Sequence, residues 1–144
     1  MKTTPIRDIM KSPVITVQLD EPFSHVEEKL RLKGIRHLPV VDHENKIVGL
    51  ITQRDLYRTI SPHRDEDGNA VYDSSTLDSF ILKRIMTPNP ATLTPDHKLA
   101  LAVDLMATGH YGCIPIVDAN KKIVGIVTET DILKFLSRLL KEDD

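Results

Sequence analysis

Several features that would narrow the function are scarce or missing in this sequence. Its 144 residues include one cysteine, Cys113, so no disulfide can form within the chain, and we expect a reducing compartment. No run of 18 consecutive apolar residues occurs, and the first eight residues lead into no long apolar segment. We therefore expect neither a membrane span nor a secretion signal, and we predict a soluble, cytoplasmic protein.

An excess of charge of one sign is missing as well. The sequence has 19 Lys and Arg against 21 Asp and Glu, which gives a formal net charge of −2, and the two signs are interspersed. A broad basic face is therefore not expected, and nucleic acid is not a favoured partner. The composition, 40% hydrophobic and 28% charged, is typical of a soluble globular protein whose length suffices for a compact core.

Catalytic and metal-binding motifs are also absent. We find no Ser/His/Asp or Cys/His arrangement and no glycine-rich phosphate loop, and the six histidines form no close ligand pair. Asp65, Asp67 and Asn69 resemble the start of a calcium loop, but the glycine comes too early and no closing glutamate follows. We expect no enzyme activity, no required cofactor and no metal.

The sequence does contain one motif twice. Two β-branched runs, Leu38–Val41 and Ile47–Ile51, are separated by a polar turn, which predicts a β-hairpin, and Thr-x-x-Asp follows directly. The same motif returns 76 residues later (131 − 55 = 76). The positions that are identical at this offset are Ile9/Ile85, Met10/Met86, Thr16/Thr92, Asp20/Asp96, Pro39/Pro115, Val41/Val117, Asp42/Asp118, Lys46/Lys122, Ile47/Ile123, Val48/Val124, Gly49/Gly125, Thr52/Thr128 and Asp55/Asp131.

This period is too long for a solenoid repeat, so the pattern indicates an internal duplication. We predict an α/β (α+β) fold in which two β-α-β-β-α repeats pack about a pseudo-twofold axis. The first repeat is expected at residues 6–60, a polar linker at 61–79, and the second repeat at 80–140.

The apolar spacing predicts the elements of the first repeat. Val14–Val17 is expected to be a strand, and the apolar positions of Phe23–Lys33 predict an amphipathic helix that Gly34 ends. After the hairpin, a second helix is predicted from Thr52 to about Ile60.

The second repeat is expected to follow the same plan. A short helix precedes it, marked by Leu77, Phe80, Ile81 and Ile85. Ala91–Leu93 is the predicted strand, and Gly109 is the predicted end of a helix whose buried face is Leu99, Ala102, Val103 and Met106. The last helix has a broad apolar face, which suggests a partner, most simply a second copy of the chain, and which consists of Ile132, Leu133, Leu136, Leu139 and Leu140.

The repeated Thr-x-x-Asp supports two compatible interpretations. Thr52 with Asp55, and Thr128 with Asp131, have the spacing of a capping box. The same geometry offers free N–H groups and a hydroxyl to a phosphate, while the aspartate can accept the hydroxyls of a ribose. The glycines that precede each motif, Gly49 and Gly125, fit either close approach of a ligand or packing of the strand on a helix.

Taken together, these residues resemble a tandem pair of CBS domains, the module named after cystathionine β-synthase. The motifs that carry the resemblance are Ile-Met, Leu-Pro-Val-Val-Asp or Ile-Pro-Ile-Val-Asp, Lys-Ile-Val-Gly and Thr-x-x-Asp, each of which occurs twice. The resemblance implies a Bateman module that binds AMP, ADP, ATP or S-adenosylmethionine in clefts between its repeats. The sequence is also similar, more weakly, to stand-alone acetoin-utilisation proteins.

In that family the aspartate holds the ribose and the threonine meets phosphate, which implies roles for Thr52, Asp55, Thr128 and Asp131. Arg36 and His37 occupy positions where family members place basic groups against phosphate, whereas the second repeat has Gly112 and Cys113 there. The two sites are therefore expected to differ, with the stronger polyphosphate preference near Arg36. The alternative for Arg36 is a solvated side chain, and for His37 a histidine at a strand edge that contacts no ligand. We expect Cys113 to be a small core residue.

The resemblance further implies that adenine lies near Ile15 or its counterpart Ala91. Pro39 and Pro115, from the repeated Pro-x-Val-Asp segments, complete the set of candidate ligand-binding residues. The leading hypothesis is a regulatory module that binds an adenine nucleotide and signals to an unidentified effector protein by a conformational change, in a homodimer. The alternative is a ligand-free scaffold for dimerisation and assembly.

Overall fold

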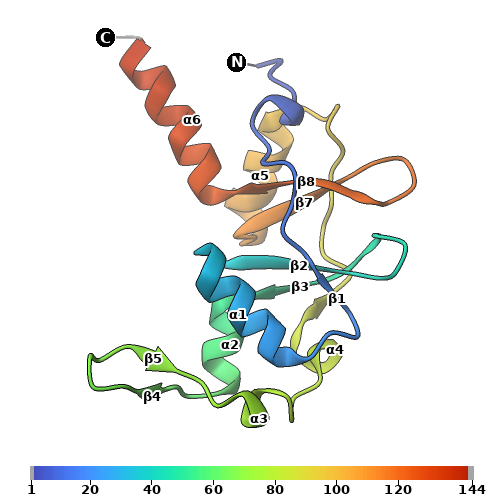
Figure 1. Cartoon of the computed structure of the whole chain (residues 1–144). Helices are drawn as coiled ribbons and strands as arrows, with labels where there is room; N and C mark the ends of the chain where they lie inside the picture. The colour runs from blue at the N-terminus through green and yellow to red at the C-terminus, as the bar shows by residue number, and fades with distance from the viewer. Residues whose placement is uncertain (1, 143–144) are drawn as a thin grey trace. The chain divides into compact units, whose positions relative to one another are not determined.

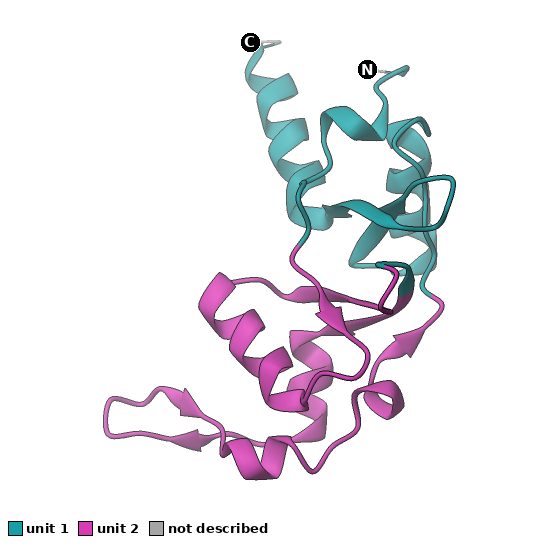
Figure 2. Cartoon of the chain, turned by 45° about the vertical axis from the view of Figure 1, so that its right-hand side comes forward, with its two compact units in different colours: residues 1–14, 45–47, 90–144 teal, residues 15–44, 48–89 magenta. Residues whose placement is uncertain are grey.

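The computed structural model describes residues 2–142 (Figure 1). The helices and strands in chain order are η1 Ile6–Asp8, β1 Val17–Gln18, α1 Phe23–Lys33, β2 His37–Val41, β3 Ile47–Thr52, α2 Gln53–Thr59, β4 His63–Arg64, β5 Ala70–Val71, α3 Ser74–Leu77, α4 Leu82–Ile85, β6 Thr87–Pro88, α5 Leu99–Gly109, β7 Cys113–Val117, β8 Ile123–Thr128 and α6 Glu129–Glu142. They form two compact units, shown in Figure 2: unit 1 comprises residues 1–14, 45–47 and 90–144, and unit 2 comprises residues 15–44 and 48–89.

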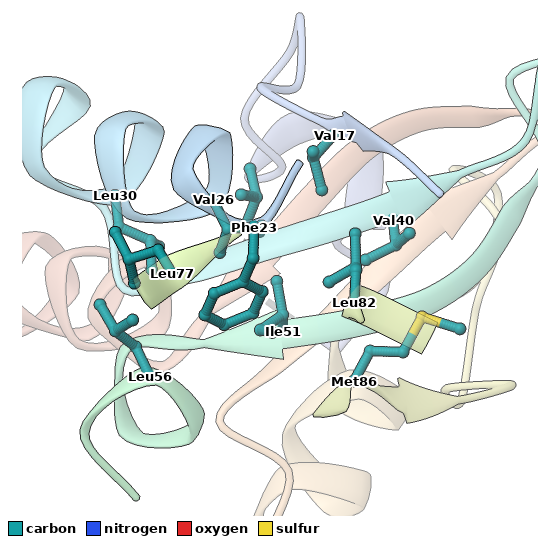
Figure 3. Packing of buried hydrophobic residues seen from close by; sticks show 11 residues of the cluster. Val17, Phe23, Val26, Leu30, Val40, Ile51, Leu56, Leu77, Leu82 and Met86 are labelled. Carbon is teal, nitrogen blue, oxygen red and sulfur yellow. The ribbon is translucent and has the colours of Figure 1, made fainter. Parts of the chain in front are cut away.

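Unit 2 is built on a sheet in the order β1-β2-β3-β6. β1 runs parallel to β2, and β6 runs antiparallel to β3. Its core, shown in Figure 3, gathers buried side chains from α1, α2, α3, α4 and the sheet, among them Val17, Phe23, Val26, Leu30, Val40, Ile51, Leu56, Leu77, Leu82 and Met86. Apolar residues at helical spacing in α1 and β-branched residues in β2 and β3 contribute to this core.

Unit 1 is built on the antiparallel hairpin of β7 and β8, in which Pro115 lies opposite Ile126. Two segments extend it: Leu93 forms a parallel bridge to Ile116, and Lys11 forms an antiparallel bridge to Ile126. The buried core residues of this unit include Ile6, Leu93, Leu99, Ala102, Ile114, Ile116 and Val127.

The segments that begin the two repeats are exchanged. Residues 6–14 begin the first repeat in sequence, yet they pack in unit 1 with the second hairpin. Conversely, α4 and β6 begin the second repeat but pack in unit 2, where Thr87 pairs with Leu50. The two pairings are equivalent, because Lys11 and Thr87, like Leu50 and Ile126, are 76 positions apart (87 − 11 = 126 − 50 = 76).

The structure confirms several predicted elements. The helix Phe23–Lys33 has the predicted bounds, and Gly34 ends it in the left-handed conformation with φ of 61°, which glycine adopts without strain. Both predicted hairpins and both helices after Thr-x-x-Asp are also present.

The predicted strands before each helix were wrong. In place of Val14–Val17, only Val17 and Gln18 pair with β2, and in place of Ala91–Leu93 there is a single bridge at Leu93. Prolines at 13 and at 88, 90 and 95 flank these segments. Because proline donates no backbone hydrogen bond, each of these strands stays short.

The linker at 61–79 is more ordered than the sequence indicates. It contains a small hairpin of β4 and β5, followed by α3, whose Leu77 is buried in the core of unit 2. The single short helix expected around Leu77 and Ile85 is two helices, α3 and α4.

Two details of α5 also differ from the prediction. Val103, predicted to be buried, is 37% exposed. The helix includes Gly109, and His110 is the residue that leaves it in the left-handed conformation, with φ of 60°. Within residues 2–142, no helix has both the length and the apolar character needed to cross a bilayer.

Candidate functional site

Thr52 begins α2 with a complete capping box. Its hydroxyl accepts a hydrogen bond from the Asp55 backbone N–H at 3.1 Å. Oδ2 of Asp55 in turn accepts from the Thr52 backbone N–H at 2.9 Å and from the Thr52 hydroxyl at 3.0 Å. All of these contacts to the Asp55 side chain use Oδ2, which leaves Oδ1 outside the cap.

Thr128 and Asp131 repeat this geometry at the start of α6. The Asp131 backbone N–H donates to the Thr128 hydroxyl at 3.3 Å, and Oδ2 of Asp131 accepts from the Thr128 backbone and hydroxyl at 2.8 and 2.9 Å. The capping interpretation is therefore confirmed in both repeats. It is compatible with a ligand role, because one carboxylate oxygen in each repeat is not used by the cap.

In each repeat, the residue before the first strand of the hairpin accepts a backbone hydrogen bond from the residue that follows the threonine of the motif. The Gln53 N–H donates to the Arg36 carbonyl at 2.9 Å, and the Glu129 N–H donates to the Gly112 carbonyl at 3.2 Å. The backbone of Arg36 therefore lies at the first turn of α2, beside Thr52 and Asp55. The Arg36 side chain is exposed, and His37 is partly buried as the first residue of β2.

Lys11 is a further candidate residue, one that the sequence did not indicate. Its Nζ lies 3.3 Å from Oδ1 of Asp131, which is 6% exposed. The equivalent position in unit 2 is Thr87, which has no charge. No local signal points to Lys11, because the contact depends on packing of residues 1–14 against the second repeat, 120 positions away in sequence (131 − 11 = 120).

The other candidates lie in the strands or just before them. Ile15 precedes β1 and is 36% exposed, while Ala91 is partly buried two residues before Leu93, whose N–H donates to the Pro115 carbonyl. Pro39 and Pro115 are buried within β2 and β7. Their side chains therefore contribute to the strand packing, and Ile15 is the most accessible residue of this group.

The glycines before each motif are explained by packing. A Cβ on Gly125 would lie 2.5 Å from Sδ of Met10 and 3.3 Å from the Lys11 carbonyl oxygen. A Cβ on Gly49 would clash in the same way with Sδ of Met86. Each glycine thus makes room for the methionine of an exchanged segment.

Cys113 is a core residue, as predicted. It is 2% exposed and lies opposite Thr128 in the β7–β8 register. Burial, followed by the nearby Glu129 carboxylate, raises the pKa of its thiol to about 12. The thiol is therefore neutral near pH 7 and is not an activated nucleophile.

Unit 2 also contains a hollow of about 680 Å³, lined by α1, α2 and the β4–β5 hairpin. None of the candidate residues lines it, although Gln53, next to Thr52, does. The hollow therefore lies against α1, α2 and the hairpin, and it shares Gln53 with the Thr-x-x-Asp motif but neither Thr52 nor Asp55.

The family model described as "CBS domain" matches the chain twice, at residues 6–62 and 82–138. A CBS domain-containing protein from Dictyostelium discoideum is 29% identical over 94% of this chain and 93% of its own length. Several other curated relatives are longer: the chain spans 22 to 63% of their length, and some of them are named as enzymes. The remainder of those relatives lies outside the match.

Solved structures agree with this match. The CBS domain pair of protein MJ0100, in complex with 5′-methylthioadenosine and S-adenosyl-L-methionine, is 27% identical with a TM-score of 0.75, covering 92% of this chain and 99% of that one. A putative acetoin utilization protein from Vibrio cholerae is 23% identical with a TM-score of 0.80, covering 98% of this chain and 97% of that one, which shows a shared fold.

Proposed function

Because the chain belongs to the CBS domain family and contains two tandem copies of the domain, we propose that it is a regulatory module that binds adenosine-containing nucleotides. The observation that carries the proposal is the pair of capping boxes, in which Asp55 and Asp131 each use only Oδ2 for the cap. The second oxygen of each carboxylate is suited to accept ribose hydroxyls. Thr52 and Thr128 lie at helix N-termini, which favour phosphate.

The ligand class follows from shared chemistry. The MJ0100 domain pair is described with 5′-methylthioadenosine and S-adenosyl-L-methionine, and both molecules contain adenosine. We propose AMP, ADP, ATP or S-adenosylmethionine as regulatory ligands of this chain. The function requires no chemical step: the effect on a partner is limited by the difference in ligand affinity between the two conformations of the module.

A homodimer is the proposed state in which the module acts. Leu133, Leu136 and Leu140 of α6 are 64, 45 and 58% exposed. Their spacing of three and then four residues is that of a seam between paired helices. Because the same seam is present on every copy, a second copy of the chain is the simplest occupant.

A ligand-free assembly scaffold is the alternative function. One observation favours it, since the capping boxes account for the Thr and Asp pairs without any ligand. In that case the exposed leucines of α6 would be the functional surface, and nucleotides would have no effect on the protein.

Thermal unfolding with AMP, ADP, ATP, S-adenosylmethionine and NAD distinguishes the two functions. A ligand at about one hundred times its dissociation constant stabilises by about 2.7 kcal/mol, which corresponds to a midpoint shift of about 5 to 10 °C at this size. We expect at least one adenosine ligand to produce this shift, each of Asp55→Ala and Asp131→Ala to reduce it, and the double variant to abolish it.

Loss of a cap by itself must be separated from loss of ligand binding. Asp73→Ala is the matched control, because Asp73 caps α3 through the Ser75 N–H and is not a candidate ligand residue. This variant should lower the unliganded midpoint slightly and keep the ligand shift. If no ligand shifts the wild type, the scaffold function replaces the nucleotide sensor.

A further inference from the structure

The two Thr-x-x-Asp motifs differ in the charge beside them. Oδ1 of Asp131 forms an ion pair with Lys11, whereas within the described part of the chain Asp55 has no ion pair. The first helical residue after the threonine also differs, since it is Gln53 in α2 and Glu129 in α6. Without Lys11, the start of α6 would present two carboxylates, which repel a phosphate.

The backbone of Lys11 is fixed while its side chain is not. The Lys11 N–H donates to the Ile126 carbonyl at 2.9 Å, and the Ile126 N–H donates back to the Lys11 carbonyl at 3.1 Å. Met10 packs against Gly125 beside this pair. The Lys11 side chain is 59% exposed, so its ammonium, on a flexible four-carbon stem, can leave Asp131 without moving the segment.

We propose that Lys11 makes the Asp131 site selective for nucleosides that carry a 5′-phosphate over unphosphorylated adenosine. This role rests on the proposed function, in which Oδ1 of Asp131 accepts the ribose hydroxyls. A nucleoside that takes this oxygen displaces the Lys11 ammonium. A phosphate on the same ligand gives the ammonium a new anionic partner, and an uncharged 5′ end does not.

The proposal changes the expected difference between the two sites. At the start of the hairpin, the first repeat has the basic residues Arg36 and His37, whereas the second repeat has Gly112 and Cys113 at the equivalent positions. The N-terminal segment of the first repeat packs in unit 1 and brings the Lys11 ammonium next to Asp131 of the second repeat. Each motif therefore has its own source of positive charge, from a strand edge in unit 2 and from residues 1–14 in unit 1.

The test measures the ratio of adenosine to AMP dissociation constants by titration calorimetry, in an Asp55→Ala background that leaves only the Asp131 site. We expect Lys11→Met to lower this ratio about 10-fold, because AMP binding weakens while adenosine binding is unchanged or slightly tighter. Lys11→Arg should keep the ratio. Lys141→Met, at the far end of α6 and exposed, is the control that should change nothing.

The outcomes separate this inference from the proposed function. If AMP binds, Asp131→Ala abolishes binding and Lys11→Met leaves the ratio unchanged, the role of Lys11 is wrong and the nucleotide site stands. If Lys11→Met weakens both ligands equally, Lys11 only stabilises the fold, and the selectivity proposal is overturned. If neither AMP nor adenosine binds while Asp131 is intact, the proposed function itself fails at this site, and the role of Lys11 with it.

Discussion

At the scale of single residues, Gly125 and Met10 show how the exchanged segment is held. The sulfur of Met10 and the Lys11 carbonyl occupy the space where a side chain at 125 would begin. The carbonyl is tied to β8 by backbone hydrogen bonds, so it cannot readily move. The glycine is therefore a steric requirement for this packing, and a ligand is not needed to explain it.

Gly125→Ala should accordingly destabilise the protein by about 1 to 3 kcal/mol, as expected for overpacking. The measurement is urea unfolding followed by circular dichroism. Gly34→Ala is an informative comparison, because nothing lies within 4 Å of its Cβ and only the left-handed φ is strained. Adding Met10→Ala should lessen the cost of Gly125→Ala and leave that of Gly34→Ala unchanged. If Met10→Ala changes the unfolding free energy by the same amount in the Gly125→Ala and Gly34→Ala backgrounds, the steric explanation is wrong.

At the scale of elements, the segment between the repeats is partly structural. Its β4–β5 hairpin is exposed, but α3 places Leu77 in the core of unit 2 with 1% of its surface exposed. The sequence predicts a polar connector here because its apolar residues are few and show no long helical or strand period. A four-residue helix such as α3 can bury a single leucine without such a period.

Leu77→Ala should therefore cost about 2 to 5 kcal/mol of unfolding free energy, the range for a buried leucine. Val71→Ala, in β5 and 45% exposed, should stay within about 0.5 kcal/mol of the wild type. Chemical denaturation of both variants gives the comparison. A neutral Leu77→Ala would mean that the linker does not contribute to the core.

At the scale of the whole molecule, the apolar seam of α6 predicts the oligomeric state. Ile132 and Phe135 pack against the core of unit 1, whereas Leu133, Leu136 and Leu140 remain exposed on the same helix. One helix thus has an inner face that stabilises its own unit and an outer face available to a second copy.

Sedimentation should show a dimer for the wild type and a monomer for Leu136→Glu, because a charge at the centre of the seam would have to be desolvated. Lys134→Glu, on the same helix but outside the seam, should remain dimeric. The monomeric variant should keep its unfolding midpoint at low protein concentration, since Leu136 is not part of the core. A monomeric wild type would remove the homodimer from the proposed function.

The sequence by itself determined the duplication, the two hairpins, the helix Phe23–Lys33 and the capping boxes. These features depend on residues close together in the chain, through period, turn chemistry and the Thr-x-x-Asp spacing. Only the tertiary structure decided which segment each repeat packs against, because Met10 and Met86 are equivalent in sequence and either could fit either glycine. That choice brings Lys11 to Asp131, and a contact across 120 positions leaves no periodic signal in the sequence.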